Sequence, residues 1–544
     1  MNKLFKKLLE KRGIGDDFLH PKYEDLADAN ILPDMDKAVK RIIQAKSHQQ
    51  KVLIYGDYDV DGVTATTIMA KTLEMAGVKD VSTMLPDRFV DGYGMSKRLV
   101  ERAKKEKVQL VITVDCGSNN KEIIDELNQA KIEVIVTDHH EISGDLPEAI
   151  AIINPKRPDF KLSVASDKKN ASLSNLSGAG VAFMVARALV KAGAIKDGME
   201  KWLLDLATIG IICDAMKLTG YNRIICYYGF IVLKKTRRAG IKELIRVADI
   251  KRLNSTAIGY QIGPRLNAAG RMETAEKALK LLMTESGAEA AEAANALNAL
   301  NEERRAQQQQ AIKEVEEYGV SEEPVLVVTG KWGEGIVGII AGKITEKYKR
   351  PSFVLTEVDG EYKGSGRSFG DFNLALAIKE CQDILTSGGG HAEACGVRLP
   401  KNKLDDFTER INNYYRSLKL SDQRKYFDVK EDLSVTELSD IDLELIDDLT
   451  KLEPFGEGNK EPIFRLRDVK ILSMTKMGKD QQHLCLIVKD YWDSTLKIVA
   501  FNADDDWMDL SAGMQIDAWV TLMENEWNGV RSVEGRILKL SVAI

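Results

Sequence analysis

The sequence has little of what secreted or membrane proteins are built from. Of its 544 residues only six are cysteine and twelve are proline, and aromatic residues make up 6%. The cysteines form no CxxC pair, so we expect reduced thiols rather than a disulfide framework. No run approaches the roughly 20 apolar residues of a membrane-spanning helix, and the N-terminus is too charged for a signal peptide. These absences predict a cytoplasmic protein without membrane contact.

Length and charge narrow the expectation further. The chain is too long for one hydrophobic core, so we expect three or four domains. Its net charge of −6 argues mildly against indiscriminate nucleic-acid binding. Residues 221–271, however, contain eleven lysines and arginines and only two acids, Glu243 and Asp249. This basic track suits a polyanion, although a solvated basic face explains its composition equally well.

Alternating strand and helix patterns predict a multidomain α/β protein. Helical stretches separate four short apolar runs, at residues 52–55, 109–114, 133–137 and 149–153. This spacing is typical of βαβ units and a mostly parallel sheet. Residues 286–318 are free of proline and rich in Ala and Glu, which predicts a long helix between two lobes. A second α/β pattern follows from 325 to 418, and the alternation after 426 predicts a small β-barrel.

Three aspartates stand at alternate positions directly after the first predicted strand. Asp57, Asp59 and Asp61 would share one face if the backbone stayed extended. Carboxylates this close repel one another strongly unless a cation lies between them. A calcium loop is an alternative, but the glutamate that closes an EF-hand is missing. The spacing therefore favours a divalent metal site.

Further candidate ligands follow two other predicted strands and one apolar run. Asp115 follows the second strand, Asp138, His139 and His140 end the third, and Asp214 follows the apolar run. Each aspartate alone is more often a helix cap, and the histidines could be solvated behind such a cap. Together they offer oxygen and imidazole ligands at one edge of a parallel sheet. This set fits two Mn²⁺ or Mg²⁺ ions about 3.5–4 Å apart, an arrangement that predominantly breaks phosphate esters.

These residues, in this order, resemble the DHH phosphoesterase superfamily, and within it the bacterial exonucleases of single-stranded DNA. The resemblance covers nearly the whole chain through motifs at residues 57–62, 85–94, 177–180, 263–271, 364–368, 388–391 and 453–459. It implies a DHH lobe, a long connecting helix, an α/β DHHA1 lobe and a C-terminal OB-like β-barrel. The expected boundaries are 1–45 for an N-terminal lead-in, 46–225 for the DHH catalytic domain, 226–320 for a helical connector with the basic track, 321–420 for the DHHA1 domain and 426–544 for the OB-fold domain.

The resemblance also implies a function, a 5′→3′ exonuclease that is specific for single-stranded DNA and releases 5′-mononucleotides in DNA repair and recombination. Its implied metal ligands are Asp57, Asp59, Asp61, Asp115, His139 and Asp214. Asp138 and His140 would be catalytic, with His140 near the scissile phosphate. Contacts to DNA or its 5′-phosphate would come from Arg265, Asn267, Arg271, Ser365, Arg367 and His391. By family alone, a single-strand binding protein and a helicase are expected partners.

The implied phosphate contacts agree with elementary chemistry. Two guanidiniums and a hydroxyl can hold a terminal phosphate in a bidentate geometry that lysine cannot match. The glycines at 388–390 would let backbone amides approach phosphates, although a simple turn explains them too. In the C-terminal part we expect two of six aromatic residues to stack on bases and the others to be core: Phe464, Tyr491, Trp492, Phe501, Trp519 and Trp527.

Two other functions fit parts of the sequence. One is a DHH phosphodiesterase acting on short oligonucleotides, RNA or cyclic dinucleotides, for which the OB-like tail would be superfluous. The other is an inactive DHH scaffold that binds DNA, a class that loses metal ligands, whereas here all are present. The chain departs from the family pattern around Asp214, between Cys213 and Ala215, and at Gly333, where histidine is frequent. It is also compact for the family, which is compatible with a divergent or mobile-element version.

Overall fold

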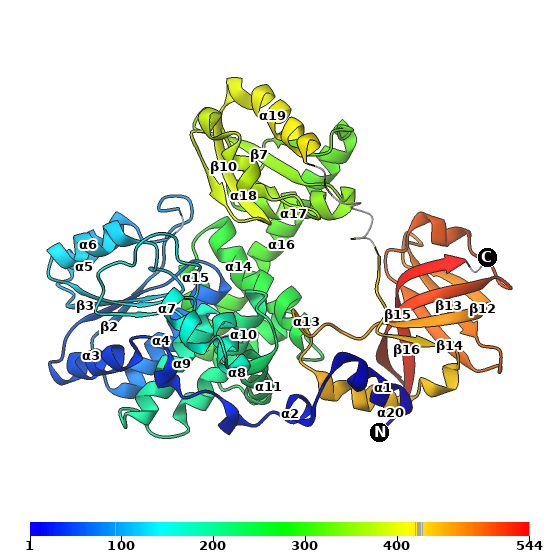
Figure 1. Cartoon of the computed structure of the whole chain (residues 1–544), viewed down its shortest axis with the longest axis horizontal. Helices are drawn as coiled ribbons and strands as arrows, with labels where there is room; N and C mark the ends of the chain where they lie inside the picture. Colours follow the sequence, from blue (N-terminus) through cyan, green and yellow to red (C-terminus); the bar gives the residue numbers. More distant parts are fainter. Residues whose placement is uncertain (93, 419, 421–425, 427, 543–544) are drawn as a thin grey trace. The chain divides into compact units, whose positions relative to one another are not determined.

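The computed structural model describes residues 1–92, 94–418, 420, 426 and 428–542. Its contacts divide the chain into two compact units, drawn in Figure 1. Unit 1 contains 1–26, 217–219 and 427–544, and unit 2 contains 27–216 and 220–426. Over the described ranges no single helix could cross a membrane by length and composition, and one bent pair, 168–175 with 178–191, passes that test together.

Unit 2 begins with a five-stranded sheet whose neighbouring strands are all parallel. In the order of the sheet its strands are β2 (Val81–Met84), β1 (Val52–Tyr55), β3 (Leu110–Val114), β4 (Glu133–Thr137) and β5 (Ala151–Ile153). The predicted parallel sheet is confirmed, and β2 is a strand that the sequence reasoning missed. An order of 2-1-3-4-5 reverses direction between β1 and β3, where open α/β sheets form their ligand-binding crevice.

Helices cover both faces of this sheet. On one face Leu53, Val111 and Val134 share a core with side chains of α5 (Lys97–Lys105) and α6 (Lys121–Gln129). The other face contacts α4 (Val60–Ala76) and α9 (Gly178–Lys191), and α3 (Met35–Ser47) packs on β5. Two short helices precede α9, α7 (Pro158–Val164) and α8 (Lys168–Ala171). Burial on both faces explains why the strands consist almost entirely of β-branched and aliphatic residues.

A helical region follows and leads to the second sheet of unit 2. Its helices are α10 (Leu204–Cys213), α11 (Gly220–Leu233), α12 (Ala239–Val247), α13 (Ser255–Ala257), a π-helical turn (Ile258–Ile262), α14 (Gly263–Met272), α15 (Glu276–Met283) and α16 (Gly287–Tyr318). Helix α16 is 32 residues long, and the side chain of Ser286 caps it by accepting from Glu289 N. The predicted long helix is therefore confirmed, and Figure 1 shows it running from α14 toward the second sheet.

The second sheet is mixed. Its strands, in order, are β6 (Leu326–Gly330), β7 (Ser352–Val358), β8 (Glu361–Arg367), β10 (Ala394–Pro400) and β9 (Ser387–Gly390). Only β6 and β7 are parallel. Its helices are α17 (Val337–Tyr348), α18 (Leu374–Lys379) and α19 (Leu404–Ser417). The glycines at 388–390, which the sequence left open between a phosphate contact and a turn, belong to the edge strand β9.

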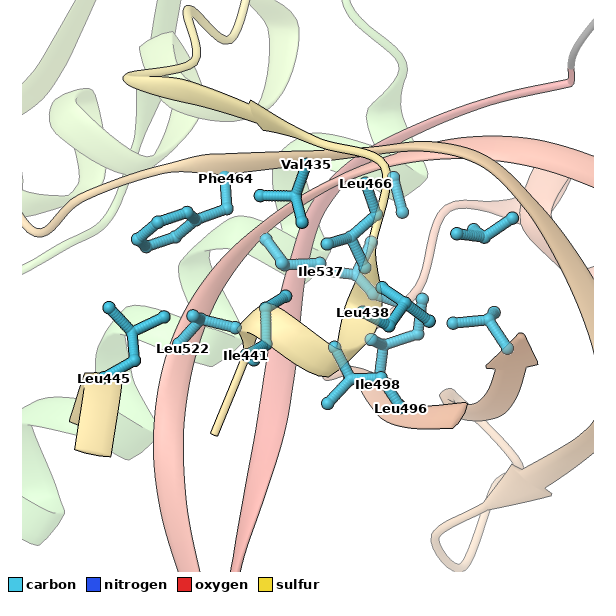
Figure 2. Close-up of a cluster of buried hydrophobic side chains, with 14 of the residues drawn as sticks. Val435, Leu438, Ile441, Leu445, Phe464, Leu466, Leu496, Ile498, Leu522 and Ile537 are labelled. Carbon is cyan, nitrogen blue, oxygen red and sulfur yellow. The ribbon is translucent and has the colours of Figure 1, made fainter. Parts of the chain in front are cut away.

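Unit 1 is built on a six-stranded sheet. Its strands are β11 (Leu433–Val435), β12 (Phe464–Met477), β13 (His483–Lys489), β14 (Thr495–Ala500), β16 (Val530–Val542) and β15 (Gln515–Trp527), and a further pairing of β12 with β15 closes the order into a ring. Figure 2 shows part of its core, in which Phe464, Leu466 and Ile537 belong to one buried cluster with Leu438 and Ile441 of the segment that leads to α20 (Leu443–Leu449).

The N-terminus belongs to the same core. Leu4, Phe5 and Leu8 of α1 (Lys3–Arg12) are buried among the residues of this cluster, and α2 (Asp16–Leu19) follows. Arg12 forms a two-pronged ion pair with Asp432, with N–O distances of 2.7 and 2.8 Å. Residues 1–45 were expected to be an N-terminal lead-in, and their first helix in fact supplies part of this apolar core. The domain boundaries given above stay a prediction.

We expect Phe464→Ala to lower the free energy of unfolding of unit 1 by about 3–5 kcal/mol, because it leaves a cavity in a core where the ring is fully buried. Chemical denaturation followed by tryptophan fluorescence measures the change. Leu472→Ala on the same strand is the control, since Leu472 is 42% exposed and should cost well under 1 kcal/mol. Equal losses in the two variants would contradict this core.

Candidate active site

The backbone after β1 turns at once into a helix. Helix α4 begins at Val60, and the side chain of Asp59 caps it by accepting from Gly62 N at 3.0 Å. The backbone therefore does not stay extended through the three aspartates, and the condition for one shared extended face is not met. Ligand atoms of Asp57 and Asp59 instead group with Asp115, all within 4.8 Å of one another.

Asp61 lies in the first turn of α4 and is held by the start of α9. Its carboxylate accepts from Gly178 N at 2.6 Å and from Ala179 N at 3.1 Å. A helix N-terminus stabilises a carboxylate in this position. A Cβ on Gly210 would lie 2.4 Å from Oδ1 of Asp61, so that glycine admits the carboxylate between α4 and α10. Asp61 is thereby fixed in one orientation.

Asp115 is the first residue after β3 and has a left-handed backbone, with φ of 61°. Its amide donates to Thr137 O of the neighbouring strand at 2.9 Å. A Cβ on Gly178 would lie 2.5 Å from Cβ of Asp115, which explains the glycine at the start of α9. Strained backbone at a buried acid is typical of functional sites.

His139 faces carboxylates of three different elements. Its Nε2 lies 3.0 Å from Asp115 Oδ1, 3.5 Å from Asp214 Oδ2 and 3.8 Å from Asp61 Oδ2. Burial, with the nearby charge of His140, lowers the pKa of His139 to about 3, so the ring is neutral. Neutral imidazole is the form that binds a metal. The structure thus brings together all six predicted ligands in overlapping groups at the switch point of the sheet.

Asp138 has a different surrounding from the other acids. Its Oδ1 accepts from His139 N at 2.7 Å and lies 2.8 Å from Nδ1 of His140, while Oδ2 accepts from Ser118 N at 2.9 Å. Burial alone would raise the pKa of Asp138, but the hydrogen bond and charge of His140 lower it. The same contact outweighs burial at His140 and raises its pKa to about 9. The buried Asp138 and the partly exposed His140 therefore form an ion pair beside the carboxylates.

The remaining carboxylates repel one another. Burial and the charge of Asp59 raise the pKa of Asp57 to about 7, and burial and the charge of Asp61 raise that of Asp214 to about 9. Burial and the neighbouring aspartates raise the pKa of Asp115 well above its usual range.

Two of these oxygens also lack a donor. Within the described residues, Oδ1 of Asp115 and Oδ2 of Asp214 are buried and accept no hydrogen bond. Buried anionic oxygens without hydrogen-bond donors need a cation to balance their charge, and the neutral imidazole of His139 does not provide one. The residues present therefore fit divalent metal ions with oxygen and nitrogen ligands.

A cluster of arginines lies beside this ring. Arg271 of α14 and Arg88 both approach the carbonyl of Gly335, at 3.4 and 3.5 Å. Burial, reinforced by the positive charges of Arg88, Arg304 and Arg367, lowers the pKa of Arg271 to about 10. Buried guanidiniums that repel one another in this way suit an anion.

The second sheet contributes to the same cluster. Ser365 and Arg367 lie on one face of β8, and the buried Gly364 and Gly366 lie on the other. A Cβ on Gly338, near the start of α17, would lie 3.0 Å from Nη2 of Arg367 and 3.3 Å from Oγ of Ser365. Three of the predicted phosphate contacts, Arg271, Ser365 and Arg367, are thus gathered around the start of a helix.

The other predicted DNA contacts are not part of this cluster, although Asn267 lies next to it. Arg265 bonds to Asn298 of α16 at 2.9 Å and to Gln261 O at 2.8 Å. Asn267 lines a cavity with Arg271. His391 is exposed in the turn after β9, where its amide donates to Ala394 O. Their roles stay predictions.

Sequence reasoning gave no role to Arg88. Its guanidinium lies 4.3 Å from the centre of the Tyr58 ring, which is a cation–π contact. Tyr58 stands between Asp57 and Asp59 in the sequence, so this contact links the arginine cluster to the acidic site. The signal was present, because residues 85–88 belong to one of the motifs that carry the family resemblance. Only the fold shows that this loop reaches Gly335.

The fold and the paired acid and arginine clusters define a DHH-type phosphoesterase. Residues 51–211 match the DHH family N-terminal domain, 322–417 the DHHA1 domain and 432–539 the RecJ OB domain. The chain is 30% identical to the single-stranded-DNA-specific exonuclease RecJ of Dickeya dadantii, over 98% of this chain and 94% of that one. It belongs to the RecJ family.

Two further relatives agree with this assignment. The RecJ of Bacillus subtilis is 36% identical over 96% of this chain, which spans 66% of that relative's length. The crystal structure of Thermus thermophilus RecJ in complex with Mn²⁺ superposes with a TM-score of 0.85 at 27% identity, covering 100% of this chain and 76% of that one. A second structure of that protein contains Mg²⁺.

We expect added Mn²⁺ to stabilise the protein, by about 2.7 kcal/mol at one hundred times the dissociation constant, and Asp115→Asn to remove most of this gain. Because burial and repulsion by the neighbouring aspartates raise the pKa of Asp115, its charge is destabilising near neutral pH without metal, so the variant without metal should be the more stable protein. Thermal unfolding with and without Mn²⁺ measures both effects. Asp80→Asn, at an exposed aspartate, should behave as the parent. A full Mn²⁺ response in Asp115→Asn would contradict the ligand assignment.

Proposed function

We propose that this protein is a metal-dependent exonuclease that degrades single-stranded DNA from the 5′ end to 5′-mononucleotides. The observation that carries the proposal is the ring of carboxylates around the buried His139, directly beside a partly buried cluster of guanidiniums. The first site can hold cations and the second an anion, which is what cleavage next to a terminal phosphate requires. The relatives are named as exonucleases with this specificity.

The ligands of the metal ions are Asp57, Asp59, Asp61, Asp115, His139 and Asp214. Two bound divalent cations would clamp the attacking and leaving oxygens of the phosphate and make the attacking water more acidic. The protein fixes the ligands in advance, because α9 amides hold Asp61 and the end of β3 holds Asp115. Such preorganisation avoids the cost of gathering like charges during the reaction.

His140 acts on the leaving group. Asp138 keeps its imidazole protonated at neutral pH and fixes its orientation through Nδ1. A cationic imidazole can neutralise charge on the phosphate and donate a proton to the departing 3′ oxygen. Asp138 does not touch the substrate in this scheme, so it is a positioning residue for His140.

Arg271, Ser365 and Arg367 bind the 5′-terminal phosphate. Two guanidiniums and a hydroxyl at the start of α17 offer charged donors together with backbone amides, the combination that favours a dianion. A terminal phosphate carries more charge than an internal phosphodiester and can enter a closed pocket. Binding there sets the 5′ polarity and restricts cleavage to the end of the strand.

The rest of the strand follows basic and aromatic surfaces. The basic track, 221–271, lies in the helical region of unit 2 and supplies charge for the phosphates. In unit 1 four of the six aromatic residues are more than half exposed, Tyr491, Trp492, Phe501 and Trp527, whereas Phe464 and Trp519 are buried. More of these rings are thus accessible for stacking on bases than the two expected.

The finer assignments belong to the same proposal. We place the domain boundaries at 46–225, 226–320, 321–420 and 426–544, with Arg265, Asn267 and His391 as further DNA contacts. A single-strand binding protein and a helicase are proposed partners, on the family resemblance alone, in DNA repair and recombination in the cytoplasm.

Digestion of end-labelled strands tests the proposal. With Mn²⁺ or Mg²⁺, a 5′ label should appear first as a mononucleotide, because the terminal phosphate is bound beside the metal site. EDTA or Asp115→Asn should lower the rate by at least about 10³-fold, since the cations supply most of the charge stabilisation. Asp80→Asn should keep full activity. Early release of a 3′ label, or undiminished cleavage in EDTA, would refute the assignment.

Arg367→Lys should reduce the preference for strands with a 5′-phosphate over strands with a 5′-hydroxyl by about 10- to 100-fold, because lysine keeps the charge but loses the bidentate geometry. The ratio of kcat/KM for the two substrates measures this preference. Arg410→Lys, at an exposed ion pair with Asp383, is the matched control and should leave the ratio unchanged. An unchanged ratio in Arg367→Lys would place the phosphate elsewhere.

A further inference from the structure

We infer that a cavity between the metal site and the arginine cluster binds the base of the 5′-terminal nucleotide, stacked on Tyr260. The inference rests on the proposed function and assigns a base-binding subsite and its aromatic platform. The cavity measures about 350 Å³, which is within the usual range for a small-molecule site. Its lining includes Cys213, Tyr260, Asn267 and Arg271.

The position of the cavity fits a single nucleotide. At one end Cys213 immediately precedes Asp214 of the carboxylate ring, and at the other Arg271 belongs to the arginine cluster. A 5′-terminal nucleotide has its own phosphate at one end and the scissile phosphate at the other. With these two groups in their sites, the sugar spans the distance between them and the base projects from it, so a cavity that touches both sites is within reach of the base.

Tyr260 is an unusual side chain on the wall of this cavity. The residue is 80% exposed, and it lies three residues before the motif 263–271, close to two charged clusters of unit 2. It is carried by the π-helical turn Ile258–Ile262, a conformation that is rare and frequent at functional sites. An exposed ring that lines a cavity beside two charged sites offers a flat apolar face on which a base can stack.

The neighbours of Tyr260 leave room for a planar ligand. Gly259 also lines the cavity, and a Cβ there would meet only Ile212 Cγ2, at 3.9 Å. The backbone therefore leaves the space beside the ring open. Pro264 and Ile339 complete apolar walls of the kind that accept the face of a base.

Asn267 supplies the polar contact that a base edge needs. Pro264, Asn267 and Arg271 lie on one face of α14, at positions i, i+3 and i+7, and all three line the cavity. Over the part of the chain that the structure describes, the Asn267 amide has no hydrogen-bond partner. An amide can donate and accept at once, so it can meet the edge of any base. Stacking plus such an adaptable contact suits an enzyme that removes nucleotides regardless of sequence.

The test compares strands with and without the 5′-terminal base. Both carry the 5′-phosphate, and one has an abasic sugar at the terminal position. For the unaltered protein with Mn²⁺ we expect kcat/KM to fall by about 10-fold when the base is absent, as stacking on one ring predicts. Tyr260→Ala should be about 10-fold slower on the intact strand and show no further loss on the abasic strand. Tyr260→Phe should behave as the parent.

The matched control is Tyr318→Ala, which removes a ring that is 90% exposed at the end of α16, away from the cavity residues. It should lose less than twofold on either strand. A further fall in the kcat/KM of Tyr260→Ala when the terminal base is removed would overturn the inference, because the ring and the base would then act independently. So would an intact-strand rate in Tyr260→Ala equal to that of the parent.

A binding measurement separates this inference from the proposed function. A strand with 2-aminopurine at its 5′ end, mixed with the protein in EDTA, should lose fluorescence on binding through stacking, and Tyr260→Ala should restore it. The same quenching in Tyr260→Ala contradicts the subsite. If the unaltered protein shows this quenching but cuts no strand with Mn²⁺, the exonuclease assignment is contradicted and the base-binding subsite is not.

Discussion

The structure of unit 2 depends on one electrostatic constraint, the burial of several carboxylates within a few ångströms of one another. Such a cluster is stable only around cations, and the surrounding fold is shaped to present it. The sheet order brings the ends of β1, β3 and β4 together, and α9 directs its first amides at Asp61. Glycines at 178 and 210 are required because a methyl group would enter the space of a carboxylate. These features have no evident value for stability alone.

The arginine cluster is the electrostatic counterpart of this ring. Arg271 is repelled by Arg88, Arg304 and Arg367, and the charge of Asp59 only partly offsets that repulsion. Each cluster is therefore unsatisfied by itself, and cations on one side with a phosphate dianion on the other complete both. A substrate that carries two phosphates one nucleotide apart satisfies this arrangement better than any single ion. Under the proposed function, selectivity for a strand end would follow from that spacing of charges.

Much of this could be predicted from the sequence, for identifiable reasons. Strands β1, β3 and β4 are short aliphatic runs that end in acids, and α16 is a long stretch without helix breakers, so local pattern and tertiary structure agree there. Strand β2, Val-Ser-Thr-Met, has no such pattern, because an edge strand needs little apolar length. The closeness of His139 to Asp214 could not be inferred from spacing, since they meet only when α10 packs against the sheet lobe. The orientation of Asp138 toward His140 likewise depends on the turn after β4.

Unit 1 shows a different limit of sequence reasoning. Helix α1 has an apolar face of Leu4, Phe5 and Leu8 that reads as an ordinary amphipathic segment, and nothing local tells which core it joins. It joins the core that includes Phe464, so the first and last parts of the chain fold as one unit. This apolar face has no core to join until the C-terminal strands have formed. The entropic cost of closing a loop rises only slowly with its length, so the long separation in sequence adds little to that cost. The docking of α1 on this core is therefore favourable at equilibrium, and during synthesis it can take place only after the C-terminal strands have been made. Removal of the C-terminal strands would leave α1 without its partner, so unit 1 has to be treated as both ends of the chain together.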